Sequence, residues 1–131
     1  PENMRRILAR SILALVQPQS PETDAVIVQS LSDLGVKFAR GDPKFMAFMP
    51  RLLFNRLQAE WVRDGGKLLQ EVCKRDWVVE QPVEVLMCCR SVGYLKGLCF
   101  TLQENVDFAE VCRPWAERWL LENPEKASPQ L

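Results

Sequence analysis

The residues of this sequence with the most chemical potential are carboxylates and cysteines, because the chain contains no histidine. Serine–histidine and cysteine–histidine catalysis are excluded in their usual forms, since both use an imidazole as the base. Two carboxylate pairs remain as candidates for acid–base chemistry, Glu104 with Asp107 and Glu80 with Glu84. Such pairs are ordinarily solvated or cap helices. The sequence therefore predicts a chain with no enzyme active site of its own.

The thiols are a second candidate site. The five cysteines are Cys73, Cys88, Cys89, Cys99 and Cys112. None forms a Cys-x-x-Cys pair, the count is odd, and without histidine the common zinc patterns are absent. A disulfide between the neighbours Cys88 and Cys89 is conceivable but strained. Buried, reduced thiols acting as small apolar residues are favoured over a redox or metal role.

Two further features could contribute to a ligand site. Gly65-Gly66 is the only adjacent glycine pair, and it lacks the spacing of a phosphate-binding loop, so a turn explains it better. Four tryptophans could line a ligand pocket, although anchoring in a core or interface is the favoured interpretation. They are Trp61, Trp77, Trp115 and Trp119.

Composition indicates one globular domain. The 131 residues are 47% hydrophobic and 26% charged, with 17 basic and 17 acidic side chains. The zero net charge argues against nucleic acid as a partner. The most apolar window, residues 83–102, is interrupted by Glu84, Arg90 and Lys96, so we expect no transmembrane segment. Residues 4–10 are basic and amphipathic, like an organelle transit segment, and a start at Pro1 suggests a processed protein or a piece of a longer one.

The elements that must position these residues are helices. Apolar spacing predicts a first helix over residues 3–17. Ser20 and Pro21 begin a second, which Gly35 ends.

Asp42 and Pro43 begin a third apolar stripe, which extends to Trp61. Pro50 lies inside this stripe and predicts a kink or two short helices.

The second half continues this pattern. A short helix is expected over residues 67–74, residues 76–80 are ambiguous, and the longest helix runs from Pro82 to about Leu102. Its expected core face is Val85, Leu86, Cys89, Val92 and Gly93. Asp107 caps a last helix, whose first turns Pro114 separates from the rest. The fold class is therefore all-α: a single orthogonal bundle of about five to seven helices over residues 1–122, with a polar tail at 123–131.

The second half also resembles a known family. The segment Arg90 to Leu102 carries an arginine, a glycine three residues on (Gly93), a second glycine four later (Gly97) and a leucine, and Pro114-Trp115-Ala116 follows in the next helix. This pattern resembles the C-terminal helices of the UbiB, or aarF-domain, atypical protein-kinase-like proteins. The first half is similar to the helices that follow this family's metal-binding Asp-Phe-Gly segment, through residues 8–15, 28–35, 41–43 and 52–54. The resemblance therefore covers roughly residues 5–121, and its motifs consist mainly of packing residues.

The resemblance implies the fold of the C-terminal helical subdomain of a kinase-like C-lobe. The family's Lys-x-Gly-Gln helix, ATP-binding lysine, catalytic-loop aspartate and metal-binding aspartate have no counterpart here. ATP and Mg²⁺ are thus expected only if an intact kinase-like parent exists, and no catalytic, cofactor or metal residue is carried over. Gly93 and Gly97 are expected to let helices approach closely, Arg90 to pair with a carboxylate or carbonyl, and Trp115 to anchor the last helix. Pro114 and Trp119 complete this set of structural or interaction residues.

Three hypotheses follow. The first is a non-catalytic C-terminal subdomain, fragment or degenerate relative of a UbiB-like protein. The second is an accessory scaffold subunit of a larger organellar complex. The third, least favoured, is a small bundle that binds a lipid or another ligand. The expected partners are other protein subunits or the rest of its own kinase-like chain. The family's association with prenylquinone and lipid metabolism implies a mitochondrion or plastid, or a bacterial membrane periphery.

Overall fold

The computed structural model describes residues 2–125, and this range contains seven α-helices, one 3-10 turn and two short strands. The predicted all-α bundle is confirmed. In chain order the elements are α1 (Glu2–Val16), α2 (Pro21–Asp33), β1 (Lys37–Phe38), α3 (Pro43–Phe54), α4 (Ala59–Val62), η1 (Arg63–Gly65), α5 (Lys67–Cys73), β2 (Val78–Glu80), α6 (Val83–Thr101) and α7 (Phe108–Glu122).

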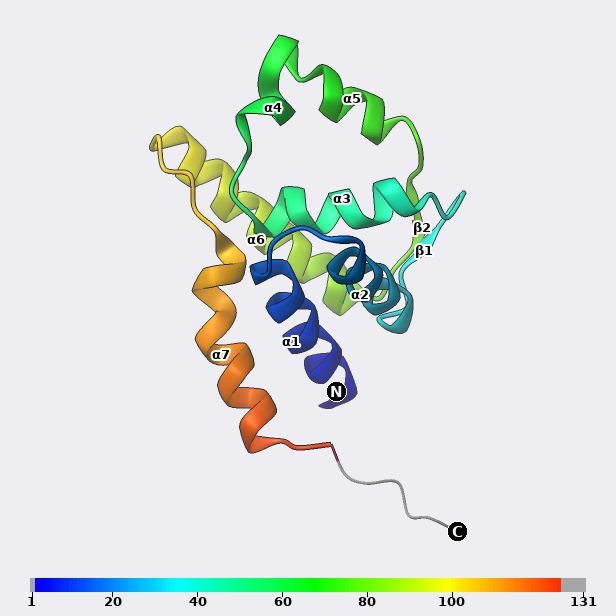
Figure 1. Ribbon diagram of the computed structural model, residues 1–131, viewed down its shortest axis with the longest axis vertical. Helices are drawn as coiled ribbons and strands as arrows, with labels where there is room; N and C mark the ends of the chain where they lie inside the picture. The colour runs from blue at the N-terminus through cyan, green and yellow to red at the C-terminus, as the bar shows by residue number, and fades with distance from the viewer. Residues whose placement is uncertain (1, 126–131) are drawn as a thin grey trace.

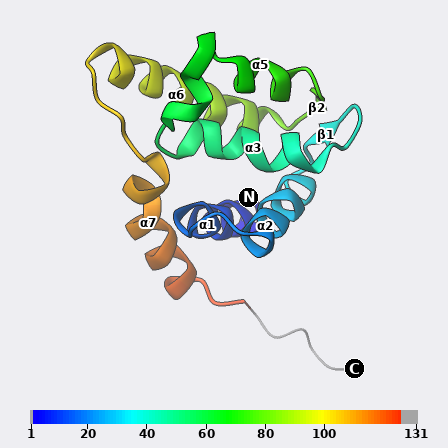
Figure 2. The same ribbon diagram turned by 45° about the horizontal axis from the view of Figure 1, so that its top comes forward.

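The helices pack around α1 and α3. Helix α1 contacts α2, α3 and α7, while α3 contacts α2, α5 and α6. Helix α3 runs across the direction of α1 and α7 (Figure 1). Helix α6 packs against α3 as well. Figure 2 shows α3, α5 and α6 grouped on one side of the α1–α2 pair. Helices α4 and α5 form an arch beyond α3.

The predicted helix starts are confirmed. Ser20 and Thr23 form a reciprocal capping box at the start of α2, with hydrogen bonds of 3.0 and 3.2 Å. Asp42 and Asp107 each accept a hydrogen bond from a backbone N–H in the first turn of α3 and α7. Gly35 follows α2 with φ +86°, a conformation that favours glycine.

The prolines do not divide the helices. Helix α3 continues through Pro50 to Phe54, so the expectation of two short helices is wrong. Helix α7 likewise continues through Pro114, and its first turns are not separate. The stripe also ends earlier than expected, because Trp61 belongs to α4. An interior proline removes a single backbone hydrogen bond, and the packing of the remaining turns keeps each helix together.

The ambiguous segment 76–80 contains a strand. Strand β2 pairs antiparallel with β1, and Lys37 forms a 3.0 Å ion pair with Glu80 across them. Just before β2, the side chain of Asp76 is only 1% exposed. Its two oxygens accept hydrogen bonds from the backbone N–H groups of Arg40 at 2.8 Å and Asp42 at 2.9 Å. These contacts fix the segment between β1 and α3.

Small residues bring α1 and α7 together. Ala9, Ala109 and Ala116 are completely buried. One core cluster joins α1, α2, α3 and α7; its buried members are Ala14, Leu15, Ile27, Phe54 and Ala109. The second core cluster joins α1 and α7; its buried members are Ala9, Ile12 and Ala116. Within residues 2–125, no helix combines the length and apolarity needed to cross a membrane.

Candidate functional site

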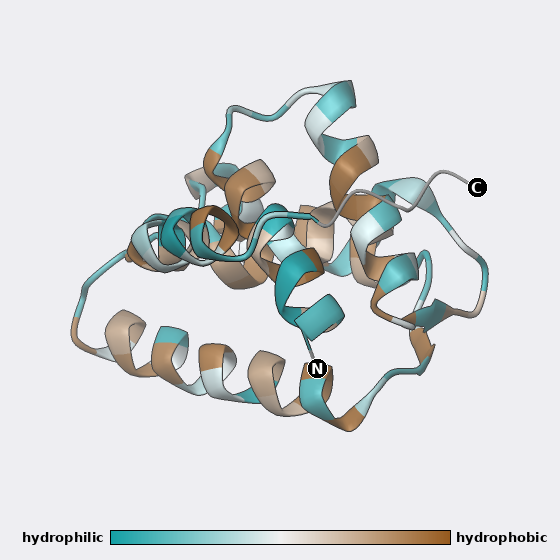
Figure 3. Ribbon diagram, turned by 90° about the horizontal axis from the view of Figure 1, so that it is seen from below, coloured by the Kyte–Doolittle hydropathy of each residue, from teal (hydrophilic) through white to brown (hydrophobic). Residues whose placement is uncertain are grey.

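Helix α6 lies along the edge of the bundle (Figure 3). None of its 19 residues is buried. The expected core face is therefore wrong in part. Val92 packs against the first core cluster while only partly buried, but Leu86 and Gly93 are exposed. Helix α6 packs chiefly on α3, which covers only one side of it.

The side of α6 that faces away from α3 is apolar. Met87, Tyr94 and Leu98 are spaced seven and four residues apart, so they share one face. Tyr94 is 71% exposed and Leu98 is 56% exposed. Val83, one turn before Met87, extends this surface. We call these four residues the outer face of α6. Large apolar side chains gathered on one exposed helix face are typical of an interaction surface, so the outer face is a candidate site.

The predicted packing residues of α6 lie beside the outer face. A Cβ atom at Gly97 would meet no atom within 4 Å, and one at Gly93 would meet only Cδ1 of Leu53, at 4.0 Å. Arg90 is exposed, and its side chain has no hydrogen bond or ion pair among residues 2–125. The expected close helix approach at Gly97 and the expected partner of Arg90 are thus not found in this part of the chain.

Trp119 anchors α7 to α1. Trp119 packs against the second core cluster, with the guanidinium of Arg6 lying 5.4 Å from its ring centroid. Arg6 also donates a 2.7 Å hydrogen bond to the carbonyl oxygen of Asn123, just beyond α7. Trp115 is 37% exposed and Pro114 beside it is exposed too, so the anchoring role expected of Trp115 stays a prediction.

The inner side of α6 borders a cavity of about 560 Å³. Helices α1, α2 and α3 supply most of its wall, through apolar residues such as Leu8, Leu31 and Met49. The first two turns of α6 and the residues before them close another side. The polar and thiol-bearing residues of the lining are Arg5, Ser11, Gln81, Glu84, Cys88 and Cys89. The cavity explains why the inner residues of α6 are half-buried rather than buried.

All five cysteines are free thiols. Four are half-buried, but Cys73 is exposed, which corrects the expectation that all are buried. Desolvation raises the pKa of Cys88, Cys89 and Cys112. These thiols therefore stay protonated, which disfavours nucleophilic chemistry in the cavity.

Lys96 joins α6 to the end of α3. Its ammonium donates hydrogen bonds to the carbonyl oxygens of Leu52, Leu53 and Asn55, at 3.3 Å for Leu53 and 2.5 Å for Asn55. Burial lowers the pKa of Lys96 to about 8, although Asp107 raises it. The sequence carried one signal for this role: a lysine on the otherwise apolar inner side of a helix.

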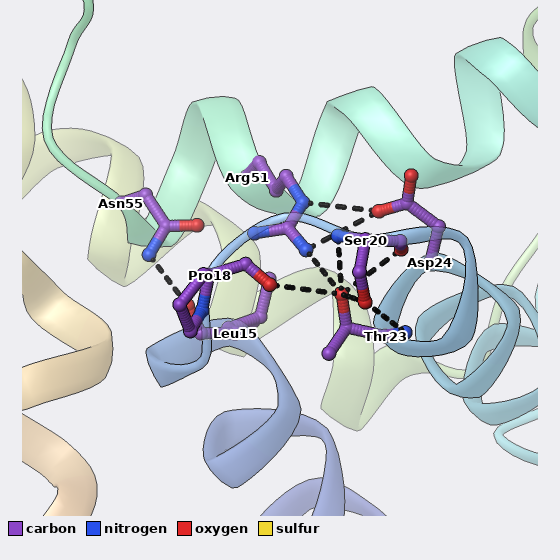
Figure 4. A network of polar contacts seen from close by, with 7 residues as sticks. All are labelled: Leu15, Pro18, Ser20, Thr23, Asp24, Arg51 and Asn55. Atoms are coloured by element: carbon purple, nitrogen blue, oxygen red, sulfur yellow. Dashed lines mark hydrogen bonds and ion pairs between the residues drawn. The ribbon is translucent and has the colours of Figure 1, made fainter.

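A buried arginine links α3 to the start of α2 (Figure 4). Arg51 is 6% exposed. It donates 3.2 Å hydrogen bonds to Oδ1 of Asp24 and Oγ1 of Thr23. One turn later, Asn55 donates a 2.9 Å hydrogen bond to the carbonyl oxygen of Leu15 at the end of α1. Sequence reasoning did not single out Arg51, because its position in an apolar stripe does not reveal a partner 27 residues away.

The carboxylate pairs are not gathered into a site. Asp107 caps α7, Glu80 pairs with Lys37, and Glu84 and Glu104 are exposed. The glycine pair lies at the expected turn, where Gly66 takes φ +77° just before α5.

The four tryptophans do not gather in one pocket either. Trp61 is buried with its ring edge-on to Phe48, whereas Trp77 is exposed beneath Arg40. The cavity and the outer face of α6 are therefore the two candidate sites. No protein-family model, curated protein or solved structure matches this chain.

Proposed function

We propose that this chain is a non-catalytic helical domain that docks onto another polypeptide through the outer face of α6. The observation that carries the proposal is the exposure of Met87, Tyr94 and Leu98 along one face of α6, a helix with no buried residue. Covering such a face removes apolar surface from water, which is the main driving force of protein association.

Two further residues support a polypeptide as the partner. Gly97 leaves open space beside the outer face, and a glycine allows another backbone to approach closely. Arg90, exposed and unpaired among residues 2–125, can pair with a carboxylate of the partner. Both belong to the motif on which the resemblance to UbiB-type proteins rests. The favoured partner is therefore the kinase-like part of a longer UbiB-like chain, for which this domain gives structural support.

A separate protein is the alternative partner. In that case the chain is an accessory scaffold subunit of a larger organellar assembly, and the likeness to UbiB reflects ancestry. In both cases the chain alone binds no ATP or Mg²⁺, and it acts in a mitochondrion or plastid, or at a bacterial membrane periphery. Titration of the isolated chain with Mg²⁺–ATP tests whether it binds the nucleotide, and measurable binding would contradict the proposal.

The docking proposal is tested by site-specific photo-crosslinking in the native cell. The crosslinking residue replaces Leu98, and the matched control replaces Leu121, a leucine of α7 that is 84% exposed and far from α6 in sequence. We expect position 98 to crosslink efficiently to one polypeptide and position 121 to crosslink little. Co-purification provides a second measurement. Leu98→Glu should reduce the amount of partner that co-purifies with the chain, and Leu121→Glu should leave it unchanged.

The intact mass of the native protein then identifies the partner. A mass of several tens of kilodaltons, with crosslinks to kinase-like residues of the same chain, supports the subdomain. A mass near 15.1 kDa with crosslinks to a different protein supports the accessory subunit. Equal and weak crosslinking at both positions would reject docking through α6.

A further inference from the structure

We propose that the cavity between α1, α2, α3 and α6 binds the aliphatic chain of a single-chain carboxylic acid, with Arg5 at its edge holding the carboxylate. The proposal rests on the inner side of α6 and is independent of docking through the outer face. It is carried by the size of the cavity, the chemistry of its wall and the charges beside it.

The cavity is a large, mainly apolar pocket that is partly open to the surface, so a ligand can enter it. Protein interiors contain few voids larger than a water molecule, and apolar cavities of about 150 Å³ already bind benzene. This cavity measures about 560 Å³, within the size range of sites for small ligands. Water gains few hydrogen bonds along the apolar part of this wall, so an apolar ligand can displace it favourably. One candidate partner, the hydroxyl of Ser11, already donates a 2.9 Å hydrogen bond to the carbonyl oxygen of Ile7.

An aliphatic chain fits this wall better than a peptide segment does. A peptide would bring backbone N–H and C=O groups into a space with few partners for them, and an unpaired buried backbone group is costly. An aliphatic chain brings no polar group beyond its head. Flexible side chains of the wall, such as Met4 and Met49, can adapt to such a chain.

The head group is identified by the charges of the lining. Arg5 comes from the first turn of α1 and Glu84 from the first turn of α6. Both are exposed, and neither forms a hydrogen bond or ion pair among residues 2–125. Arg5 can therefore accept an anionic partner, while the charge of Glu84 disfavours a head group with more than one negative charge. A single carboxylate meets both conditions.

The first test is a chain-length series. Saturated carboxylic acids from eight to sixteen carbons, kept below their micelle concentrations, are titrated into the full chain. We expect the Kd to fall about fourfold for each added methylene until the cavity is filled, and then to level off, since each buried methylene contributes about 0.8 kcal/mol. A Kd that does not depend on chain length would overturn the proposal.

The cavity thiols give a second, site-resolved test. Cys88 and Cys89 line the cavity, whereas Cys73 is exposed and outside it. We expect the bound acid to slow alkylation of Cys88 and Cys89, measured by mass spectrometry, and to leave Cys73 unchanged. Equal slowing of all three would indicate adsorption or micelles, and no slowing would place the acid elsewhere; either result rejects the site.

Arg5→Met tests the head group. We expect on the order of tenfold weaker binding of the acid and unchanged binding of the alcohol of the same length, because only the acid loses a charge-assisted contact. Arg10→Met, another exposed arginine of α1 but outside the lining, is the matched control and should leave both affinities unchanged. Equal losses in the two variants would exclude Arg5 as the head-group contact. Leu98→Glu should not affect binding, which separates this proposal from docking.

Discussion

The ammonium of Lys96 on α6 donates a 2.5 Å hydrogen bond to the carbonyl oxygen of Asn55, the residue that ends α3. It also reaches the carbonyls of Leu52 and Leu53. The last carbonyls of a helix have no partner within it, and a positive charge there is favourable. Lys96 therefore caps α3 and holds α6 against it, so its charge state affects both helices.

The stability contributed by Lys96 should depend on pH. Burial lowers the pKa of Lys96 in the folded chain to about 8, against 10.5 for an ordinary lysine. Between these values the unfolded chain binds a proton that the folded chain has released, so the free energy of unfolding rises with pH. We therefore compare the free energies of unfolding of the natural chain and Lys96→Met by urea denaturation. Between pH 8 and pH 10.5, the free energy of unfolding of the natural chain should rise relative to that of the variant. A difference that falls with pH would mean that the carbonyl contacts keep the amine charged.

Loss of the buried arginine should be strongly destabilising. Arg51→Met leaves Asp24 without its cation and Thr23 without one of its donors, inside the packed junction of α2 and α3. We expect the free energy of unfolding to fall by about 2 to 3 kcal/mol. The control is Lys37→Met, which breaks an exposed ion pair and should change stability by about 0.5 kcal/mol or less. Similar losses in the two variants would show that the buried network contributes little.

Asp76 should stabilise the chain at neutral pH and lose that effect in acid. Burial alone would raise the pKa of Asp76, but hydrogen bonds from the backbone N–H groups of Asp42, Arg40 and Trp77 outweigh it and lower the pKa below 3.8. The stability that Asp76 contributes is thus fully present at pH values above 3.8, its unfolded pKa, and is lost as the pH falls through the pKa of the folded chain. We compare the free energies of unfolding of the natural chain and Asp76→Asn by denaturation at several pH values. The natural chain should be more stable than the variant by the largest amount above pH 5. An unchanged difference at pH 3 would contradict this.

Gly97→Ala should stabilise the isolated chain. The new methyl group meets open space, and alanine is favoured over glycine inside a helix by about 0.5 to 1 kcal/mol. Gly66→Ala is the contrasting variant and should be destabilising, because Gly66 has φ +77°. Thermal unfolding of both variants measures the effect. A lower Tm for Gly97→Ala would mean that glycine is required at this position even without a docked partner.

Local signals predicted the helix ends well. Ser20, Asp42 and Asp107 are caps whose partners lie within three residues, so each could be found without knowing the fold. The turns at Gly35 and Gly66 were predictable for the same reason. The expectation of breaks at prolines failed, because tertiary packing can hold a helix together across a proline.

Sequence reasoning failed where the relevant contacts join distant segments. The apolar residues of α6 occur on all sides, so periodicity could not show which side packs on α3. The pairing of α1 with α7 depends on Ala9, Ala109 and Ala116, and alanines are too common to mark an interface. The positions of Arg51 and Lys96 within apolar stripes did not reveal their partners, because these partners lie in other segments of the chain. Both candidate sites depend on these distant contacts.

The contact between α1 and α7 has a consequence for how the chain reaches its fold. Arg6 and Asn123 are separated by 117 residues, so α1 finds its main partner, α7, only after five other helices have been made. On a ribosome, the alanine surface of α1 therefore remains uncovered until α7 has emerged, and closing so long a loop is slow. We expect the newly made chain to depend on chaperones until its last helix is available.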